Sequence, residues 1–212
     1  MRRGCRYDRM KMAGTKRRFA PGNGMAYAIL HYEMPPVGGG KRKENMMKKC
    51  RAAVIGCGNI SVMHLDSITH LEGMELAAVC DVKRERAEAA AEKYHTKAYT
   101  DYTELLETER PDAVHLCLPH YLHIPAAQEA LKKGVHVLSE KPMSIRYEDA
   151  FETVQLAKSC GLQYGVIFQC RYNTPSQLVK KRITDGRLGR VKCARSTLTW
   201  YRPEDYYAGS DW

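Results

Sequence analysis

Short apolar runs alternate with amphipathic stretches along most of this chain of 212 residues. Near-continuous apolar runs that end in glycine, proline or a polar residue predict strands buried on both faces, at 52–55, 76–80, 113–118, 135–138 and 164–168. Between them, apolar residues recur at helical spacings, which predicts helices over 60–71, 84–94, 101–107, 124–134 and 144–160. This alternation predicts an α/β fold, with a doubly wound parallel sheet between two layers of helices.

The two ends of the chain depart from this alternation. Residues 1–48 show little hydrophobic periodicity, so we expect a disordered basic leader, with Met46 or Met47 as the natural start of the protein. Beyond the last predicted strand, the pattern predicts a helix over 174–184 and a loosely alternating strand over 191–200. The expected organisation is a leader, 1–48, an α/β domain, 49–168, and the incomplete start of an α+β domain, 169–212.

Positive charge is concentrated in the leader. Residues 1–50 hold 13 lysines and arginines against 3 acidic residues, whereas residues 51–212 hold 21 of each kind. Because the body is neutral, we expect a solvated leader and no nucleic-acid partner; a nucleic-acid-binding arm is the alternative. No run approaches the roughly 20 apolar residues of a membrane-spanning helix, so we expect no membrane association.

The cysteines and histidines show no metal-binding pattern. None of the eight cysteines belongs to a Cys-x-x-Cys pair, and three of them, Cys57, Cys80 and Cys117, fall near strand ends as small buried hydrophobes do. This usage predicts a reducing, cytoplasmic environment. No metal is expected, because no carboxylate completes a ligand set with the histidines; those considered are His115, His120, His123 and His136.

A glycine-rich turn, Gly56–Ser61, follows the first predicted strand. Gly56 permits a tight turn, and Gly58 lets the backbone approach a pyrophosphate that the N-terminus of the next helix attracts. Ser61 replaces the third Gly or Ala of the dinucleotide fingerprint, and its small side chain preserves close helix–strand packing. Asp81 ends the second strand 20 residues later, where an acid hydrogen-bonds ribose hydroxyls. Together these features predict a Rossmann dinucleotide-binding domain.

The same acid bears on the choice of cofactor. Asp81 would repel the 2′-phosphate of NADP, so NAD is the expected cofactor and NADP the less favoured one. Lys83 and Arg84 lie close by and would partly offset this repulsion. A non-binding α/β protein with a glycine turn is the structural alternative.

A second polar motif, Glu140 and Lys141 followed by Pro142, comes after the fourth predicted strand. Ligands of open α/β sheets bind beyond the carboxyl ends of the strands, and Pro142 favours an extended Lys141. A lysine beside a nicotinamide would hold and polarise a substrate oxygen, on which hydride transfer develops charge. By spacing alone, this role and an exposed surface loop explain the motif equally well.

Taken in order, these motifs resemble the Gfo/Idh/MocA (glucose–fructose oxidoreductase / inositol dehydrogenase) family. The shared motifs are Ala53–Ile60 with His64, Ala78–Asp81, Leu116–Pro119 with His123, His136–Pro142, Gln169–Asn173 and Gly186–Gly189. The resemblance covers about residues 49–212. It implies an NAD(P)-dependent oxidoreductase that moves a hydride between nicotinamide and a sugar, cyclitol or related hydroxy compound. It also implies a larger α+β substrate domain that continues beyond Trp212, and a homo-oligomeric full-length protein.

The resemblance also implies roles for individual residues. Lys141 would be the catalytic residue and would contact both cofactor and substrate, whereas the general acid or base would lie beyond the end of this chain. The alternative is a non-catalytic NAD-binding module or a truncated pseudo-enzyme. The implied cofactor contacts are Gly56, Gly58, Asn59 and Ile60 at the pyrophosphate, Asp81 at the ribose, Leu118, Pro119 and His123 towards the nicotinamide, and Glu140 and Lys141 at the reacting centre.

Overall fold

The computed structural model of the chain describes residues 49–208. The predicted disordered leader, 1–48, and the candidate starts Met46 and Met47 lie outside the described residues.

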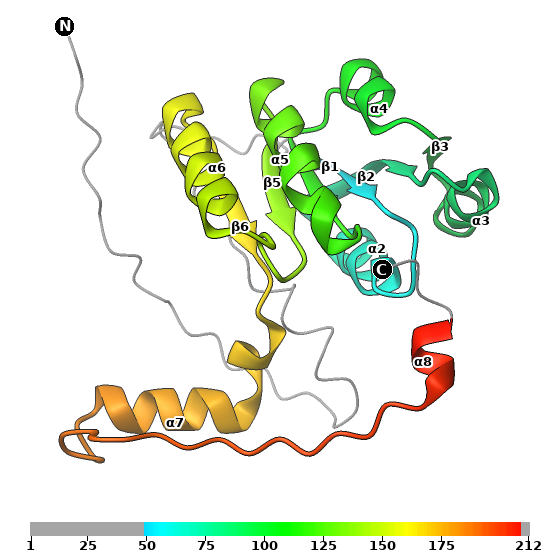
Figure 1. Ribbon diagram of the computed structural model, residues 1–212. Helices are drawn as coiled ribbons and strands as arrows, with labels where there is room; N and C mark the ends of the chain where they lie inside the picture. The colour runs from blue at the N-terminus through cyan, green and yellow to red at the C-terminus, as the bar shows by residue number, and fades with distance from the viewer. Residues whose placement is uncertain (1–48, 209–212) are drawn as a thin grey trace, which may run out of the picture.

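A six-stranded parallel sheet forms the centre of the structure, in the order β3-β2-β1-β4-β5-β6 (Figure 1). The order reverses between β1 and β4, which makes the space beyond their carboxyl ends the expected ligand site of a doubly wound sheet. The predicted α/β Rossmann architecture is confirmed. The strands are β1 (Cys50–Ile55), β2 (Met74–Cys80), β3 (Lys97–Tyr99), β4 (Ala113–Leu116), β5 (His136–Ser139) and β6 (Tyr164–Val166).

Helices cover both faces of the sheet because successive strand residues point to opposite sides. Ala53 and Ile55 of β1 pack in one apolar cluster with α4, α5 and α6, whereas Ala52 and Val54 pack in a second cluster with α2 and α3. Strand β1 is therefore apolar on both faces, which explains its near-continuous apolar run. The helices are α2 (Ser61–His70), α3 (Arg84–Tyr94), α4 (Tyr102–Glu109), α5 (His123–Lys132) and α6 (Tyr147–Cys160).

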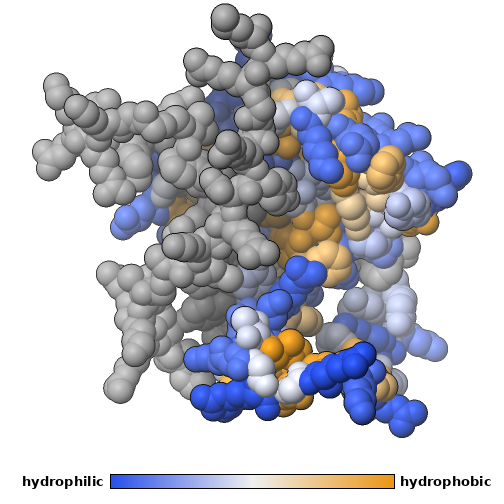
Figure 2. All heavy atoms as spheres, turned by 90° about the vertical axis from the view of Figure 1, so that its left-hand side faces the viewer, coloured by the Kyte–Doolittle hydropathy of each residue, from blue (hydrophilic) through white to orange (hydrophobic). Residues whose placement is uncertain are grey.

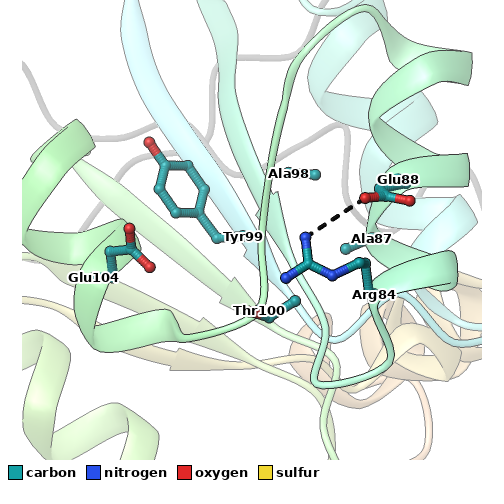
Figure 3. Close-up of a pocket in the computed structure, with 7 residues that line it drawn as sticks. All are labelled: Arg84, Ala87, Glu88, Ala98, Tyr99, Thr100 and Glu104. Atoms are coloured by element: carbon teal, nitrogen blue, oxygen red, sulfur yellow. Dashed lines mark ion pairs between the residues drawn. The ribbon is translucent and has the colours of Figure 1, made fainter.

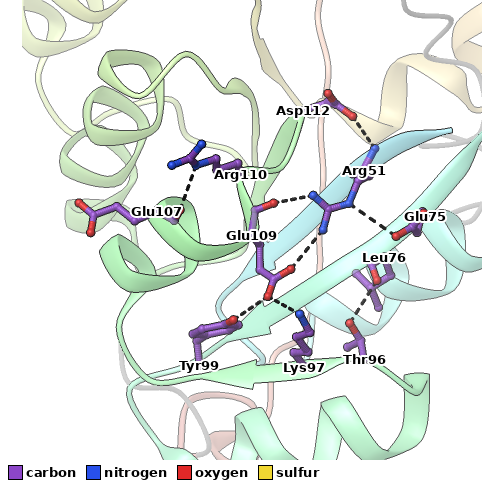
Figure 4. A network of polar contacts seen from close by, with 10 residues as sticks. All are labelled: Arg51, Glu75, Leu76, Thr96, Lys97, Tyr99, Glu107, Glu109, Arg110 and Asp112. Atoms are coloured by element: carbon purple, nitrogen blue, oxygen red, sulfur yellow. Dashed lines mark hydrogen bonds and ion pairs between the residues drawn. The ribbon is translucent and has the colours of Figure 1, made fainter. Parts of the chain in front are cut away.

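A buried carboxylate fastens the amino-terminal edge of the sheet (Figure 4). Glu109, at the end of α4, accepts hydrogen bonds from Lys97 Nζ at 2.8 Å, Tyr99 Oη at 2.6 Å and Arg51 Nη2 at 3.1 Å. The Lys97 hydrogen bond, then that of Tyr99, lowers the pKa of Glu109, and the Glu109 contact in turn raises the pKa of Tyr99 to about 12. The backbone N–H of Arg51 donates to Asp112 at 2.8 Å. This network ties β1, β3 and α4 together at the edge opposite the glycine turn.

The structure differs from the sequence expectations in three elements. The predicted strand over 191–200 is wrong: the segment has no regular secondary structure and pairs with no strand of the described chain. Strand β3 was not predicted, because it has only three residues and carries no periodic signal. The helix expected over 144–160 begins only at Tyr147.

The segment after β6 packs little against the sheet. A 3-10 turn (Gln169–Tyr172) leads into α7 (Thr174–Thr184), which confirms the predicted helix, and a short α8 (Glu204–Ala208) ends the described residues. Figure 2 shows apolar side chains among charged ones low in the molecule, where α7 lies; its exposed apolar residues are Leu178, Val179 and Ile183. Across residues 49–208, no helix combines the length and apolarity needed to cross a bilayer.

Candidate functional site

Gly56 closes the turn between β1 and α2 in a conformation that suits glycine alone. Its φ is +95°, and a Cβ at this position would lie 2.3 Å from the carbonyl oxygen of Cys117, after β4. Its N–H donates to the carbonyl of Cys80, at the end of β2, at 2.7 Å. Gly56 therefore brings the ends of β1, β2 and β4 into contact.

The rest of the turn presents the N-terminus of α2. Ser61 is buried, and its Oγ donates to the carbonyl of Gly58 at 2.6 Å, which fits its place in the packed third position. A Cβ on Gly58 would meet no atom within 4 Å, and Asn59 is exposed, so the turn borders open space. The N–H groups of Ser61 and Met63 donate to the carbonyls of Gly58 and Ile60 at 3.0 and 3.1 Å. The positive end of the helix dipole, with the other N–H groups of this first turn, attracts anions. The turn therefore fits a pyrophosphate.

Asp81 lies just after β2 and holds the turn from the side. Its two carboxylate oxygens accept the backbone N–H groups of Cys57 and Lys83, each at 2.8 Å, and only 8% of the residue is exposed. Burial first, and the Asp81 charge second, raises the pKa of the Cys57 thiol to about 12. The thiol therefore stays neutral beside the position expected for the pyrophosphate.

A polar pocket of about 250 Å³ lies next to Asp81, between α3, the end of β3 and the start of α4 (Figure 3). Arg84 forms an ion pair with Glu88 at 3.6 Å on its rim, and Glu104 lies across from them. Tyr99 lines the pocket, and its carbonyl accepts a hydrogen bond from the backbone N–H of Asp81. The pocket is too small for a whole dinucleotide and adjoins the end of the site where the ribose acid lies.

His123, at the start of α5, lies in the interior and joins two loops of the candidate site. Its Nδ1 is 2.6 Å from the carbonyl of Pro142 and its Nε2 is 2.8 Å from the carbonyl of Leu118. A neutral imidazole donates one of these hydrogen bonds and an imidazolium donates both. Because the residue is 0% exposed, its ring does not form part of the site's surface. It links the two loops from within.

Glu140 and Lys141 follow β5 at the same edge. Glu140 N–H donates to the carbonyl of Leu116, the last residue of β4, at 2.9 Å, and the Glu140 side chain is buried. Lys141 is exposed, and its ammonium has no hydrogen bond or ion pair with any described residue. Burial, and then the His123 and Lys141 charges, lowers the pKa of nearby His120. The free ammonium is available to a ligand at this edge.

The structure therefore brings the predicted residues to the carboxyl edge of the sheet. Of these, Leu118 and Pro119 are partly exposed. Sequence reasoning gave no function to His64 and discounted His115. In the structure the two rings are buried and in contact, and His64 also contacts Glu140. The available signal was a polar residue within an apolar helix face and another within an apolar strand.

Comparisons with known proteins identify the family to which this fold belongs. Residues 50–168 match the Gfo/Idh/MocA family, described as an oxidoreductase family with an NAD-binding Rossmann fold. D-Glucoside 3-dehydrogenase of Escherichia coli (strain K12) is 32% identical over 143 residues, which are 66% of this chain and 41% of that enzyme. Myo-inositol 2-dehydrogenase of Thermotoga maritima is 28% identical over 148 residues, 69% of this chain and 44% of that enzyme.

Solved structures give the same result. The WlbA dehydrogenase of Bordetella pertussis, in complex with NADH and UDP-GlcNAcA, superposes with a TM-score of 0.75 and is 36% identical. The superposition covers 78% of this chain and 48% of that one. The match thus spans less than half the length of each of these three relatives, and the resemblance drawn from the motifs is confirmed.

Proposed function

Because this chain belongs to the Gfo/Idh/MocA family of NAD-binding oxidoreductases, we propose that it forms the dinucleotide-binding part of an NAD-dependent dehydrogenase. The complete enzyme moves a hydride between nicotinamide and a hydroxyl-bearing carbon of a sugar, cyclitol or related compound. The observation that carries the proposal is the turn at Gly56, held by Asp81 and opening on empty space at Gly58. Named relatives act on sugars and cyclitols.

In this proposal the cofactor extends along the carboxyl edge of the sheet. The turn residues Gly56, Gly58, Asn59 and Ile60 receive the pyrophosphate at the start of α2. Asp81 accepts from the ribose hydroxyls with lone pairs that its two backbone hydrogen bonds leave over. The nicotinamide end lies towards Lys141, past the loops that carry Leu118, Pro119 and His123, and Glu140 supports that end from within.

Lys141 is the residue that we propose for catalysis. A bound NAD would accept the hydride in oxidation, and NADH would donate it in reduction. The exposed Lys141 ammonium holds the substrate oxygen and stabilises negative charge on it as its carbon loses or gains hydride, while the hydroxyl proton is exchanged with a general acid or base elsewhere in the complete enzyme. Such a fixed cation lowers the barrier because the charge appears only as the reaction proceeds.

We further propose that NAD is preferred to NADP. A 2′-phosphate would approach the Asp81 carboxylate, and the arginine that lines the pocket, Arg84, is partly neutralised by Glu88. The other acid on the pocket, Glu104, adds to the repulsion. Lys83 and Arg84 limit the preference without reversing it.

The enzyme is proposed to act in the cytoplasm, as a homo-oligomer. The seven described cysteines are all thiols outside disulfides, which suits a reducing cytoplasm. The partner is a small sugar-like molecule, and the full-length enzyme is a homo-oligomer, which sedimentation of the full-length protein would test.

Fluorescence titration of the chain with NADH and, separately, NADPH tests the cofactor proposal. We expect saturable NADH binding that is tighter than NADPH binding, and a smaller difference in Asp81→Asn, which keeps one acceptor but loses the charge. Tighter NADPH binding would refute the NAD preference. Failure of the folded chain to bind either nucleotide would refute the site.

Turnover of sugars and cyclitols by the complete enzyme, followed by NADH absorbance, tests Lys141. We expect Lys141→Ala to bind NADH and to lower kcat about a hundredfold, the usual effect of removing one charge-stabilising donor. Lys158→Ala is the matched control, because Lys158 is an exposed lysine in the last turn of α6 and has no proposed role in the site. NADH binding without turnover in the unaltered protein would favour the non-catalytic NAD-binding module.

A further inference from the structure

Three buried polar side chains are hydrogen-bonded in a row beneath the carboxyl edge of the sheet. His115 on β4 and His64 on α2 approach with their Nδ1 atoms 3.1 Å apart, and His64 Nε2 is 3.2 Å from Glu140 Oε1. His64 is 0% exposed, His115 4% and Glu140 7%. Buried polar groups are costly unless paired, and apolar side chains would fill this space at less cost. Packing alone therefore does not account for these three polar side chains.

The direction of these hydrogen bonds follows from the groups involved. Burial first, and the nearby His64 second, lowers the pKa of His115 to about 3, so this ring is neutral. A carboxylate oxygen only accepts, so His64 Nε2–H donates to Glu140. The His64 Nδ1 then accepts from His115 when His64 is neutral and donates to His115 when His64 is protonated. In both states Glu140 keeps the same hydrogen bond, which fixes its side chain.

Glu140 passes this constraint to the next residue. Its second oxygen, Oε2, accepts the backbone N–H of Lys141 at 3.3 Å. On the far side of Lys141, the carbonyl of Pro142 is bonded to His123. The main chain at Lys141 is thus held on both sides, whereas its side chain remains exposed.

We propose that His64 is a positioning residue for Lys141, acting through Glu140. Because His64 lies on α2, whose first turn receives the pyrophosphate in the proposed function, it sets the distance between the two ends of the dinucleotide site. The inference rests on that function and adds to it the residue that fixes the nicotinamide end relative to the pyrophosphate end.

Two substitutions separate the two contacts of His64. An asparagine amide occupies roughly the position of Nδ1, so His64→Asn keeps the contact with His115 and loses that with Glu140. A glutamine amide reaches roughly the position of Nε2, so His64→Gln does the reverse. Ser67→Ala is the matched control: Ser67 is a buried α2 residue whose Oγ, within residues 49–208, bonds only to the carbonyl of Met63 in its own helix.

Calorimetric binding of NADH and of ADP-ribose, which lacks nicotinamide, to the 212-residue chain measures the effect at each end. We expect His64→Asn to weaken NADH binding roughly tenfold, the usual effect of losing a hydrogen bond to a charged group, with ADP-ribose binding unchanged. His64→Gln and Ser67→Ala should bind both ligands as the unaltered chain does. Amide hydrogen exchange should speed up at Lys141 in His64→Asn alone.

Other outcomes overturn the inference. If His64→Asn weakens both ligands in parallel, the ring only supports α2. If His64→Gln is the defective variant, the contact that matters is with His115, in the core. If no variant changes NADH binding, Lys141 needs no such support. If the unaltered chain binds neither ligand, the proposed function is refuted and this inference with it. If the unaltered chain binds NADH normally, the three outcomes above refute the role of His64 and leave the proposed function intact.

Discussion

Alanine at Gly56 should lower the stability of the fold and alanine at Gly58 should lower cofactor affinity, although the two residues lie in one turn. At Gly56, the new Cβ would lie 2.3 Å from the carbonyl oxygen of Cys117, where ordinary contacts begin at 3.4 Å. The φ of +95° is also one that L residues rarely adopt. At Gly58 the new Cβ meets nothing within 4 Å and no positive φ is required.

The magnitudes follow from these distances. At Gly56, a left-handed backbone costs roughly 1–2 kcal/mol and separating two packed backbone segments by about an ångström adds roughly 1–3 kcal/mol. The sum, about 2–5 kcal/mol, is a large part of the 5–15 kcal/mol that stabilises a typical domain. Gly58→Ala should change the free energy of unfolding by no more than about 0.5 kcal/mol. Its methyl group occupies the space proposed for the pyrophosphate, so NADH affinity should fall roughly tenfold.

Urea unfolding followed by far-UV circular dichroism, with NADH titration in the absence of urea, measures both effects. Gly56→Ala should unfold at a clearly lower urea concentration, and Gly58→Ala should unfold with the unaltered chain while binding NADH poorly. Equal destabilisation by both substitutions would refute the steric reasoning. Normal NADH binding by Gly58→Ala would refute the placement of the pyrophosphate.

Two further predictions concern groups with shifted pKa values. The folded pKa of Glu109 lies below its ordinary 4.5, mainly through Lys97, so its stabilising effect is complete above pH 4.5 and is lost as the pH falls through the folded pKa. Glu109→Gln should therefore cost roughly 1–3 kcal/mol at neutral pH by urea unfolding, with a difference that shrinks in acid; a constant difference would contradict the assignment. Cys57, with a pKa of about 12 against an ordinary 9.0, has about a thousandfold less thiolate than a free cysteine. Iodoacetamide should therefore alkylate it far more slowly than exposed Cys160 by mass spectrometry; similar rates would count against its burial.

The elements that sequence reasoning predicted are those whose signal is local. The run 52–55 is apolar at every position because helices cover both faces of β1, and this can be recognised without knowing any neighbour. The segment 97–99 gives no such signal, since two of its three residues are exposed and it pairs only with β2. The alternation over 191–200 resembles a strand, but a strand exists only with a partner, and the described chain offers none.

The site divides in the same way. The turn at Gly56 and the acid at Asp81 were predicted because their roles depend on a few neighbouring residues and on the strand ends beside them. The contact between His64 and Glu140 joins positions 76 residues apart, and nothing in the local pattern specifies it. Likewise, the carbonyl contacts of His123 depend on where two separate loops end.

The hydrogen bonds also divide the proposed cofactor residues into two groups. Asp81, Glu140 and His123 are bonded within the protein through both polar atoms of their side chains, so replacing any of them alters the loops as well as the site. Gly58 and Lys141 face open space, and their side-chain positions make no such bonds with described residues. A loss of binding in the first group therefore mixes folding with recognition. Substitutions at Gly58 and Lys141 leave these internal hydrogen bonds in place, so the function is better judged from them.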